Sequence, residues 1–160
     1  MTALATPAGG NPRRPTDDRR LLLVVDDACT APELCASVRE FAGGTPVEAF
    51  VIAPAGGTAS TQWFVDEDAA RADATRRLRT CLTCLASEGM SVHGELSDPD
   101  PIQGIADALH EFAADEILLV SPPQRPSRWL GRTVVEHARH AFRQPVTHIV
   151  MPGRPERDAR

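Results

Sequence analysis

Apolar residues in this chain gather into four short clusters, at residues 21–26, 47–53, 117–120 and 146–151, and a fifth short segment, 91–96, is less apolar. These five segments alternate with longer ones whose apolar residues recur at helical spacing. Short apolar runs bounded by charged or turn residues are typical of strands, and a strand that is apolar on both faces suits a parallel sheet. The pattern therefore predicts five strands in one parallel sheet.

The segments between these clusters carry start signals for helices. The signals are Thr30 with Glu33, the acidic run 66–68, Asp100 with Pro101 and Gln103, and Thr133 with Glu136. A hydroxyl or carboxylate at the cap, a proline in the first turn and acidic residues near the helix start all favour an N-terminus. We therefore expect a helix after each of the first four strands, ending near 43, 87, 112 and 142.

Strands that alternate with helices predict right-handed crossovers and an α/β fold. We expect a single doubly wound, Rossmann-like sheet of five parallel strands in the order 3-2-1-4-5, with helices on both faces. The domain is expected to cover residues 20–151. Residues 1–19 and 152–160, rich in proline, glycine and charge, are expected to be a disordered N-terminal tail and a flexible C-terminal tail.

Composition excludes several classes of function. All 17 basic residues are arginine and tyrosine is absent, so lysine-dependent phosphate loops, Schiff-base chemistry and tyrosine acid–base catalysis lack their central residue. The net charge of -5 has the wrong sign for neutralising the phosphates of nucleic acid, so we expect no nucleic-acid partner. The longest aliphatic run, 21–25, is far below the ~20 residues that span a bilayer. The first 19 residues hold no apolar core of a secretory signal, so we expect a cytoplasmic protein without a membrane partner.

The predicted strand order places a ligand crevice between the first and fourth strands, at their carboxyl ends. The loops that meet there bring Asp26 and Asp27 from one side and residues 121–133 from the other. The second loop offers Ser121, Arg125, Arg128 and Arg132 beside the free N–H groups of a helix N-terminus. This set predicts a site for a small phosphorylated ligand. The alternative is that an aspartate pairs with one of the arginines and closes an empty crevice.

Three segments resemble the universal stress protein family. They are the 21–26 strand with its capped helix, the run from Gly94 through Asp98-Pro99 to Ala114-Asp115, and the ending from Leu130-Gly131 through His140-Ala141 to Pro145-Val146. The resemblance covers about residues 20–151 in the family's order. It implies a binding or regulatory domain in the stress response that acts by association rather than by catalysis.

In members that bind ATP, the phosphate motif is Gly, two residues, Gly, nine residues, Gly, then Ser or Thr. Here Val120 and Pro123 stand at the first two glycine positions. Gly131 matches the third glycine only if the loop is two residues short and Arg132 replaces the hydroxyl residue, whereas the full spacing places Thr133 and Val134 there. We therefore expect ATP binding of the family's kind to be weak or absent.

The resemblance also matches single positions to the adenosine pocket. Asp26 matches the aspartate near the adenosine, and Ala53 lies where the second strand lines the adenine. The first alternative is accordingly a domain that binds ATP or another adenine nucleotide through a diverged loop, with weak ATP hydrolysis as the one activity considered.

The four cysteines, Cys29, Cys35, Cys81 and Cys84, are expected to be reduced and partly buried thiols. Cys81 and Cys84 have CxxC spacing, which leaves a thiol redox protein as the second alternative, although the pair lies inside a predicted helix. The spacing of the cysteines and histidines does not complete a ligand set, so we expect no metal site.

The last strand is an edge strand in the predicted order. Residues 146–151 hold no charge or internal proline that would discourage pairing. Many universal stress proteins dimerise through this strand, so the resemblance points the same way. We expect a homodimer with antiparallel last strands at its centre, in which Thr147, Ile149 and Met151 lie on one face; a further protein partner is left open.

Overall fold

The computed structural model describes residues 18–25, 31–54, 67–121 and 132–150. Several predicted features lie outside these ranges. They are the two tails apart from Asp18 and Arg19, the thiol of Cys29, and the candidate residues Asp26, Asp27, Arg125, Arg128, Gly131 and Met151.

The described strands form one parallel sheet. They are β1 (Arg19–Val25), β2 (Val47–Pro54), β3 (Ser91–Ser97), β4 (Glu116–Ser121) and β5 (Val146–Val150). Their order is β3-β2-β1-β4-β5, and every neighbouring pair is parallel. The predicted fold class and strand order are therefore confirmed. β1 starts at Arg19, two residues before the predicted strand, because Arg19 pairs with Val47 in the β1–β2 ladder.

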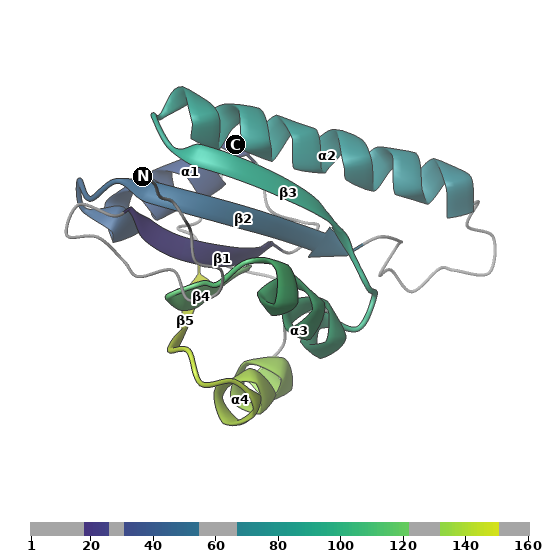
Figure 1. Ribbon diagram of the computed structural model, residues 1–160. Helices are drawn as coiled ribbons and strands as arrows, with labels where there is room; N and C mark the ends of the chain where they lie inside the picture. Colours follow the sequence, from purple (N-terminus) through teal and green to yellow (C-terminus); the bar gives the residue numbers. More distant parts are fainter. Residues whose placement is uncertain (1–17, 26–30, 55–66, 122–131, 151–160) are drawn as a thin grey trace, which may run out of the picture.

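Four helices cover the two faces of the sheet (Figure 1). They are α1 (Ala31–Ala42), α2 (Glu67–Ser87), α3 (Pro101–Glu111) and α4 (Arg132–Ala141). Side chains of α1 and α2 pack in one apolar cluster with alternate residues of the central strands, including Leu21 and Leu118. Those of α3 and α4 pack in a second cluster with the intervening residues, including Leu22 and Leu119. The sheet is thus apolar on both faces, as continuous apolar strands require.

The predicted helix N-termini agree with the structure at some positions and differ at others. Asp100 is the N-cap of α3, since its side chain accepts a hydrogen bond from the backbone N–H of Ile102. Gln103 does not complete a capping box, because its amide donates to Asp107 Oδ1 one turn along the helix. The prediction for the last helix is wrong by two residues, since a cap at Thr133 would place the first helical residue at Val134. α4 begins at Arg132, so Thr133 already lies within the first turn rather than at the cap.

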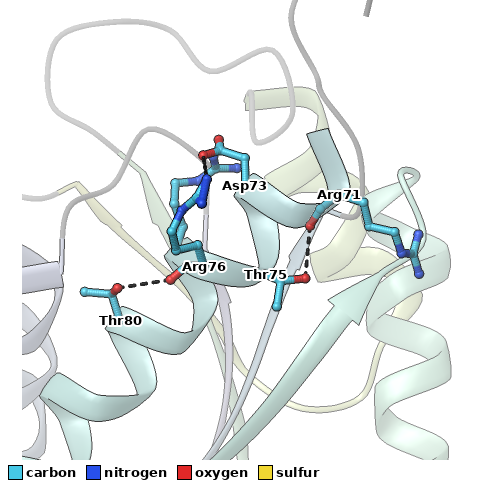
Figure 2. A network of polar contacts seen from close by, with 6 residues as sticks. Arg71, Asp73, Thr75, Arg76 and Thr80 are labelled. Atoms are coloured by element: carbon cyan, nitrogen blue, oxygen red, sulfur yellow. Dashed lines mark hydrogen bonds and ion pairs between the residues drawn. The ribbon is translucent and has the colours of Figure 1, made fainter. Parts of the chain in front are cut away.

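α2 is the longest helix and carries its own polar contacts on the surface (Figure 2). Asp73 forms ion pairs with Arg76 and Arg77, and the hydroxyls of Thr75 and Thr80 donate to carbonyls one turn back. Pairs at these spacings stabilise the exposed face of a helix. Within the described ranges, no helix combines the length and the apolar character needed to cross a membrane.

The expectation of reduced cysteines is wrong for one pair. Cys35 of α1 and Cys84 of α2 form a disulfide with a Cα–Cα distance of 6.3 Å, whereas Cys81 is a buried free thiol. The bond joins residues 49 positions apart, and only the packing of α1 beside α2 brings them together. The CxxC pair of the redox alternative is therefore not a bonded pair, because Cys84 is bonded to Cys35.

Candidate functional site

The carboxyl ends of β1 and β4 lie side by side, since Val25 and Val120 are the last paired residues of these strands. The chain leaves β1 toward α1 on one face, whereas α3 and α4 lie on the other face (Figure 1). This is the point where the crossovers change face, and ligands of open α/β sheets bind beyond it. The predicted crevice position is thus present in the described fold.

Ser121 is the last residue of β4 and supplies a hydroxyl at this edge. It is buried, with 5% of its surface exposed. Its Oγ lies 2.7 Å from Nε2 of His148 on β5. In the parallel β4–β5 pair, His148 stands opposite Leu119 and Val150 opposite Ser121, so the imidazole reaches two positions along the strands to the hydroxyl.

The surroundings of His148 favour its neutral form. Partial burial lowers the pKa of the imidazole below its ordinary value of 6.5, and the positive charge of Arg139 lowers it further. Arg139 comes from α4, which packs on this face, and its Nε donates to the carbonyl of Val146. The imidazole therefore stays uncharged at neutral pH, with one nitrogen protonated.

This neutral pair can take two hydrogen-bonding arrangements. When Nε2 of His148 lacks a proton, the Ser121 hydroxyl donates to it. When Nε2 carries the proton, the imidazole donates to Oγ, and the hydroxyl proton is free to be donated to a ligand oxygen. An anion beside Ser121 would select the second arrangement. The pair is thus able to serve as a donor to a phosphate or carboxylate.

The end of β2 carries a second polar contact. The Ser97 hydroxyl on β3 donates to the carbonyl of Ala53 at 3.2 Å, and the same oxygen lies 3.2 Å from the carbonyl of Asp98. The side chain of Ala53 shares the face of Val51, which packs beneath α1 and α2, because alternate residues of a strand share a face. Ser121 shares the opposite face with Leu119, and β1 lies between the two strands. The structure therefore does not bring Ala53 and Ser121 together on one face.

Val120, which stands where the family's motif has its first glycine, is fully buried in the cluster beneath α1 and α2. Its side chain lies on the face opposite Ser121 and does not cover the hydroxyl. The valine side chain that stands in place of glycine is therefore accommodated in the core. Arg132 and Thr133 lie in the first turn of α4, and Pro123 lies outside the described residues.

Two of the residues predicted for a dimer interface have contacts within the chain. The Thr147 hydroxyl donates to Glu116 Oε2 at 3.0 Å, and Ile149 packs partly against the cluster beneath α1 and α2. Val150 projects from the other face and is 52% exposed. Of the β5 residues, Val150 therefore offers the most apolar surface to a second molecule.

Sequence reasoning did not assign His148 to the site. The register of the last two strands is the signal that was missing, because pairing of Ile117 with Val146 places His148 and Ser121 on one face. Two-residue periodicity alone separates the faces within a strand but does not align two strands.

Comparison with known proteins agrees with this architecture. No protein-family model and no curated protein matches the sequence. The structure of a universal stress protein from Archaeoglobus fulgidus matches with a TM-score of 0.53 and 22% identity, over 82% of this chain and 93% of that chain. A structure of the universal stress protein from Archaeoglobus fulgidus in complex with dAMP matches with a TM-score of 0.56 and 21% identity, over 82% and 97% of the chains. The chain therefore has the universal stress protein fold that its sequence motifs predict.

Proposed function

We propose that this chain is a ligand-binding domain of the universal stress protein type that takes an adenine nucleoside monophosphate beyond the carboxyl ends of β1 and β4. The observation that carries the proposal is the buried Ser121 hydroxyl, held by His148 at the edge where the crossovers change face. The fold neighbour crystallised with dAMP supports the choice of ligand class. The domain binds its ligand and does not turn it over.

A monophosphate suits the described edge better than ATP. The hydroxyl of Ser121 offers one donor, which can bind one oxygen of a single phosphate group. A triphosphate needs a cradle of backbone N–H groups, which glycines provide because their backbone can approach the phosphates closely. Valine and proline stand at the first two glycine positions of that cradle in this sequence, namely Val120 and Pro123.

Calorimetric titration of the purified protein with AMP, dAMP and ATP tests the proposal. We expect AMP and dAMP to bind more tightly than ATP, and Ser121→Ala to weaken AMP binding about tenfold or more through the lost hydrogen bond to a charged group. Ser37→Ala removes another buried serine hydroxyl, on α1, and is expected to leave AMP binding unchanged. Native mass spectrometry of the same protein would reveal a co-purified nucleotide.

Two results would overturn this function. One is the absence of binding by AMP, dAMP and ATP at millimolar concentration. The other is micromolar affinity for ATP that Ser121→Ala leaves unchanged, since the phosphates would then be held elsewhere.

The protein is further proposed to act in the cytoplasm as a homodimer in the stress response. β5 stands at the edge of the sheet, paired within the described residues to β4 alone, and its exposed Val150 supplies apolar surface. An edge strand without charge or proline favours pairing with another strand. A two-fold axis at this edge would lay the β5 strands of two copies antiparallel.

Sedimentation of the unmodified protein and of Val150→Asp tests the association. In a two-fold dimer the substitution meets its own copy, so like charges near the axis should give a monomer. Val150 is a better choice than Ile149, which packs partly in the core, so that an aspartate there would destabilise the fold as well. A monomeric unmodified protein would contradict the dimer.

A further inference from the structure

We propose that Cys35 and Cys84 form a reversible redox site, in which a low-molecular-weight disulfide oxidises the two thiols to the bond that ties α1 to α2. This site goes beyond the proposed nucleotide function. It also replaces the CxxC pair that the sequence offered, because Cys84 is bonded across the helix pair and not within its own helix.

The two helices hold the cysteines at a bonding distance. α1 and α2 lie on the same face of the sheet, and the Cα atoms of Cys35 and Cys84 are 6.3 Å apart, inside the range that disulfides span. Leu34 and Val38 on α1, with Leu78 and Leu85 on α2, fix this spacing through the core. The thiols would therefore stay close to each other after reduction.

The two cysteines of the pair differ in exposure. Cys35 is 3% exposed, whereas Cys84 is half-buried and packs against the cluster that α1 and α2 share. Cys84 is therefore the residue of the pair that a small thiolate reaches more readily. Attack there forms a mixed disulfide at Cys84 and releases Cys35 as a thiolate, which takes up a proton.

A second small thiolate then attacks the sulfur of the bound small molecule. This frees Cys84 as a thiolate and releases a small-molecule disulfide. The net reaction converts one protein disulfide and two small thiols into two protein thiols and one small disulfide. Oxidation of the site is the same exchange in reverse, so the electrons pass to the small disulfide.

Cys81 provides a contrast one turn away on α2. It is buried, and burial raises the pKa of its thiol, against a smaller lowering by Arg77. Exchange requires a thiolate, so Cys81 remains a thiol while Cys84 reacts. Cys84 thus differs from Cys81 in its greater exposure and in its bond to Cys35.

Reduction should loosen the helix pair without unfolding the protein. The Arg39–Glu88 ion pair, at 2.9 Å, also joins the C-terminal ends of the two helices, and the shared core persists. The disulfide closes a loop between residues 49 positions apart, so its loss is expected to lower the thermal midpoint by roughly 10 °C.

The test combines redox titration with peptide mapping. The full-length protein is equilibrated in glutathione buffers of increasing oxidised fraction, alkylated under denaturing conditions, and digested without reduction. We expect a cross-linked Cys35–Cys84 peptide that appears in one two-electron transition, with Cys81 alkylated throughout. The thermal midpoint should rise over the same transition.

Cys84→Ser and Cys81→Ser are matched variants on one helix. Cys84→Ser should have the midpoint of the reduced protein and no response to the buffer, whereas Cys81→Ser should keep the full response. Three results would overturn the site: no cross-link at any ratio, a cross-link that includes Cys81, or a Cys35–Cys84 bond that persists in the most reducing buffer. The last would make the bond a permanent structural one.

Discussion

The two ends of the parallel strands differ in how their polar side chains are used. At the amino edge, where the strands begin, charged side chains pair with one another and with backbone groups of several elements. The carboxyl edge is where the strands end. At the carboxyl edge, the last residues of the strands make contacts between neutral groups, the Ser121–His148 pair and the Ser97–Ala53 hydrogen bond. The carboxylates of Asp98 and Asp100, after β3, accept from backbone N–H groups. The same fold thus carries a region fixed by charge at one end and a region with adaptable donors at the other.

Arg20 shows how the amino edge is fixed. Its guanidinium pairs with Glu48 of β2 at 3.1 Å, donates to the carbonyl of Ala113 at 2.8 Å, and stacks over the ring of Phe112. Its backbone N–H donates to Asp115 Oδ2. One residue of β1 therefore ties the neighbouring strand and the connection after α3 to the sheet.

Glu116 also joins neighbouring strands, on the side of β1 where β4 lies. Its carboxylate accepts from Arg19 at 3.1 Å through one oxygen and from Thr147 at 3.0 Å through the other. Three strands meet at this side chain. These side chains already bind partners on several elements of the fold, which is why we assign the amino edge to stability and the carboxyl edge to binding.

The largest effect on stability is expected at Arg20. Arg20→Ala should lower the free energy of unfolding by about 2 kcal/mol, because two hydrogen bonds to a charged group and a ring contact are lost from a partly buried position. Urea denaturation measures the change. Arg143→Ala, at an exposed arginine, is the control. Equal effects of the two substitutions would contradict the assignment of the amino edge.

A smaller effect is expected at Glu116. Glu116→Gln keeps the shape but removes the charge that pairs with Arg19, and should cost about 1 kcal/mol of stability. The same substitution at Glu88 breaks the ion pair with the more exposed Arg39 and should cost about 0.3 kcal/mol. Denaturant midpoints of the two variants check this order. A larger loss for Glu88→Gln than for Glu116→Gln would contradict the prediction.

Ser121→Ala should separate binding from stability. Its hydroxyl bonds to a half-buried imidazole that water can reach, so we expect a loss of only about 0.5 kcal/mol. The same variant is expected to lose AMP affinity about tenfold. A stability loss as large as that of Arg20→Ala, with affinity unchanged, would place Ser121 among the structural residues.

The smallest effect concerns pH. The pKa of His148 is lowered in the folded protein by burial and by Arg139, so the unfolded chain takes up this proton first as pH falls. The stabilisation that the neutral His148 contributes to the folded state is complete above about pH 6.5 and is lost as the pH decreases below that value. Unfolding of the unmodified protein and of His148→Asn between pH 7.5 and 5.5 should show a shallower pH dependence in the variant. Identical slopes would exclude the imidazole as the cause.

Much of the fold was predictable because it rests on local patterns. Apolar clusters locate β1, β2, β4 and β5, a less apolar segment marks β3, and Asp100 with Pro101 locates the start of α3. The helix end after α1 was also predictable, since Gly43 and Gly44 adopt positive φ angles, which favour glycine. The start of α4 differs by two residues from the start that a cap at Thr133 predicts, since Arg132 is already helical.

The position of the candidate site in the fold was predictable, whereas its residues were predictable only in part. The sequence determined that parallel strands with helical crossovers exist, so a change of face and a polar edge near Ser121 followed from chain order. Only the tertiary structure decided which side chains meet there and elsewhere: His148 with Ser121, Cys84 with Cys35, and Glu116 with both Arg19 and Thr147. The physical reason is that local periodicity fixes the face of each residue within its own element. The partner of that residue depends on the register and packing of elements that are 27 to 97 positions apart.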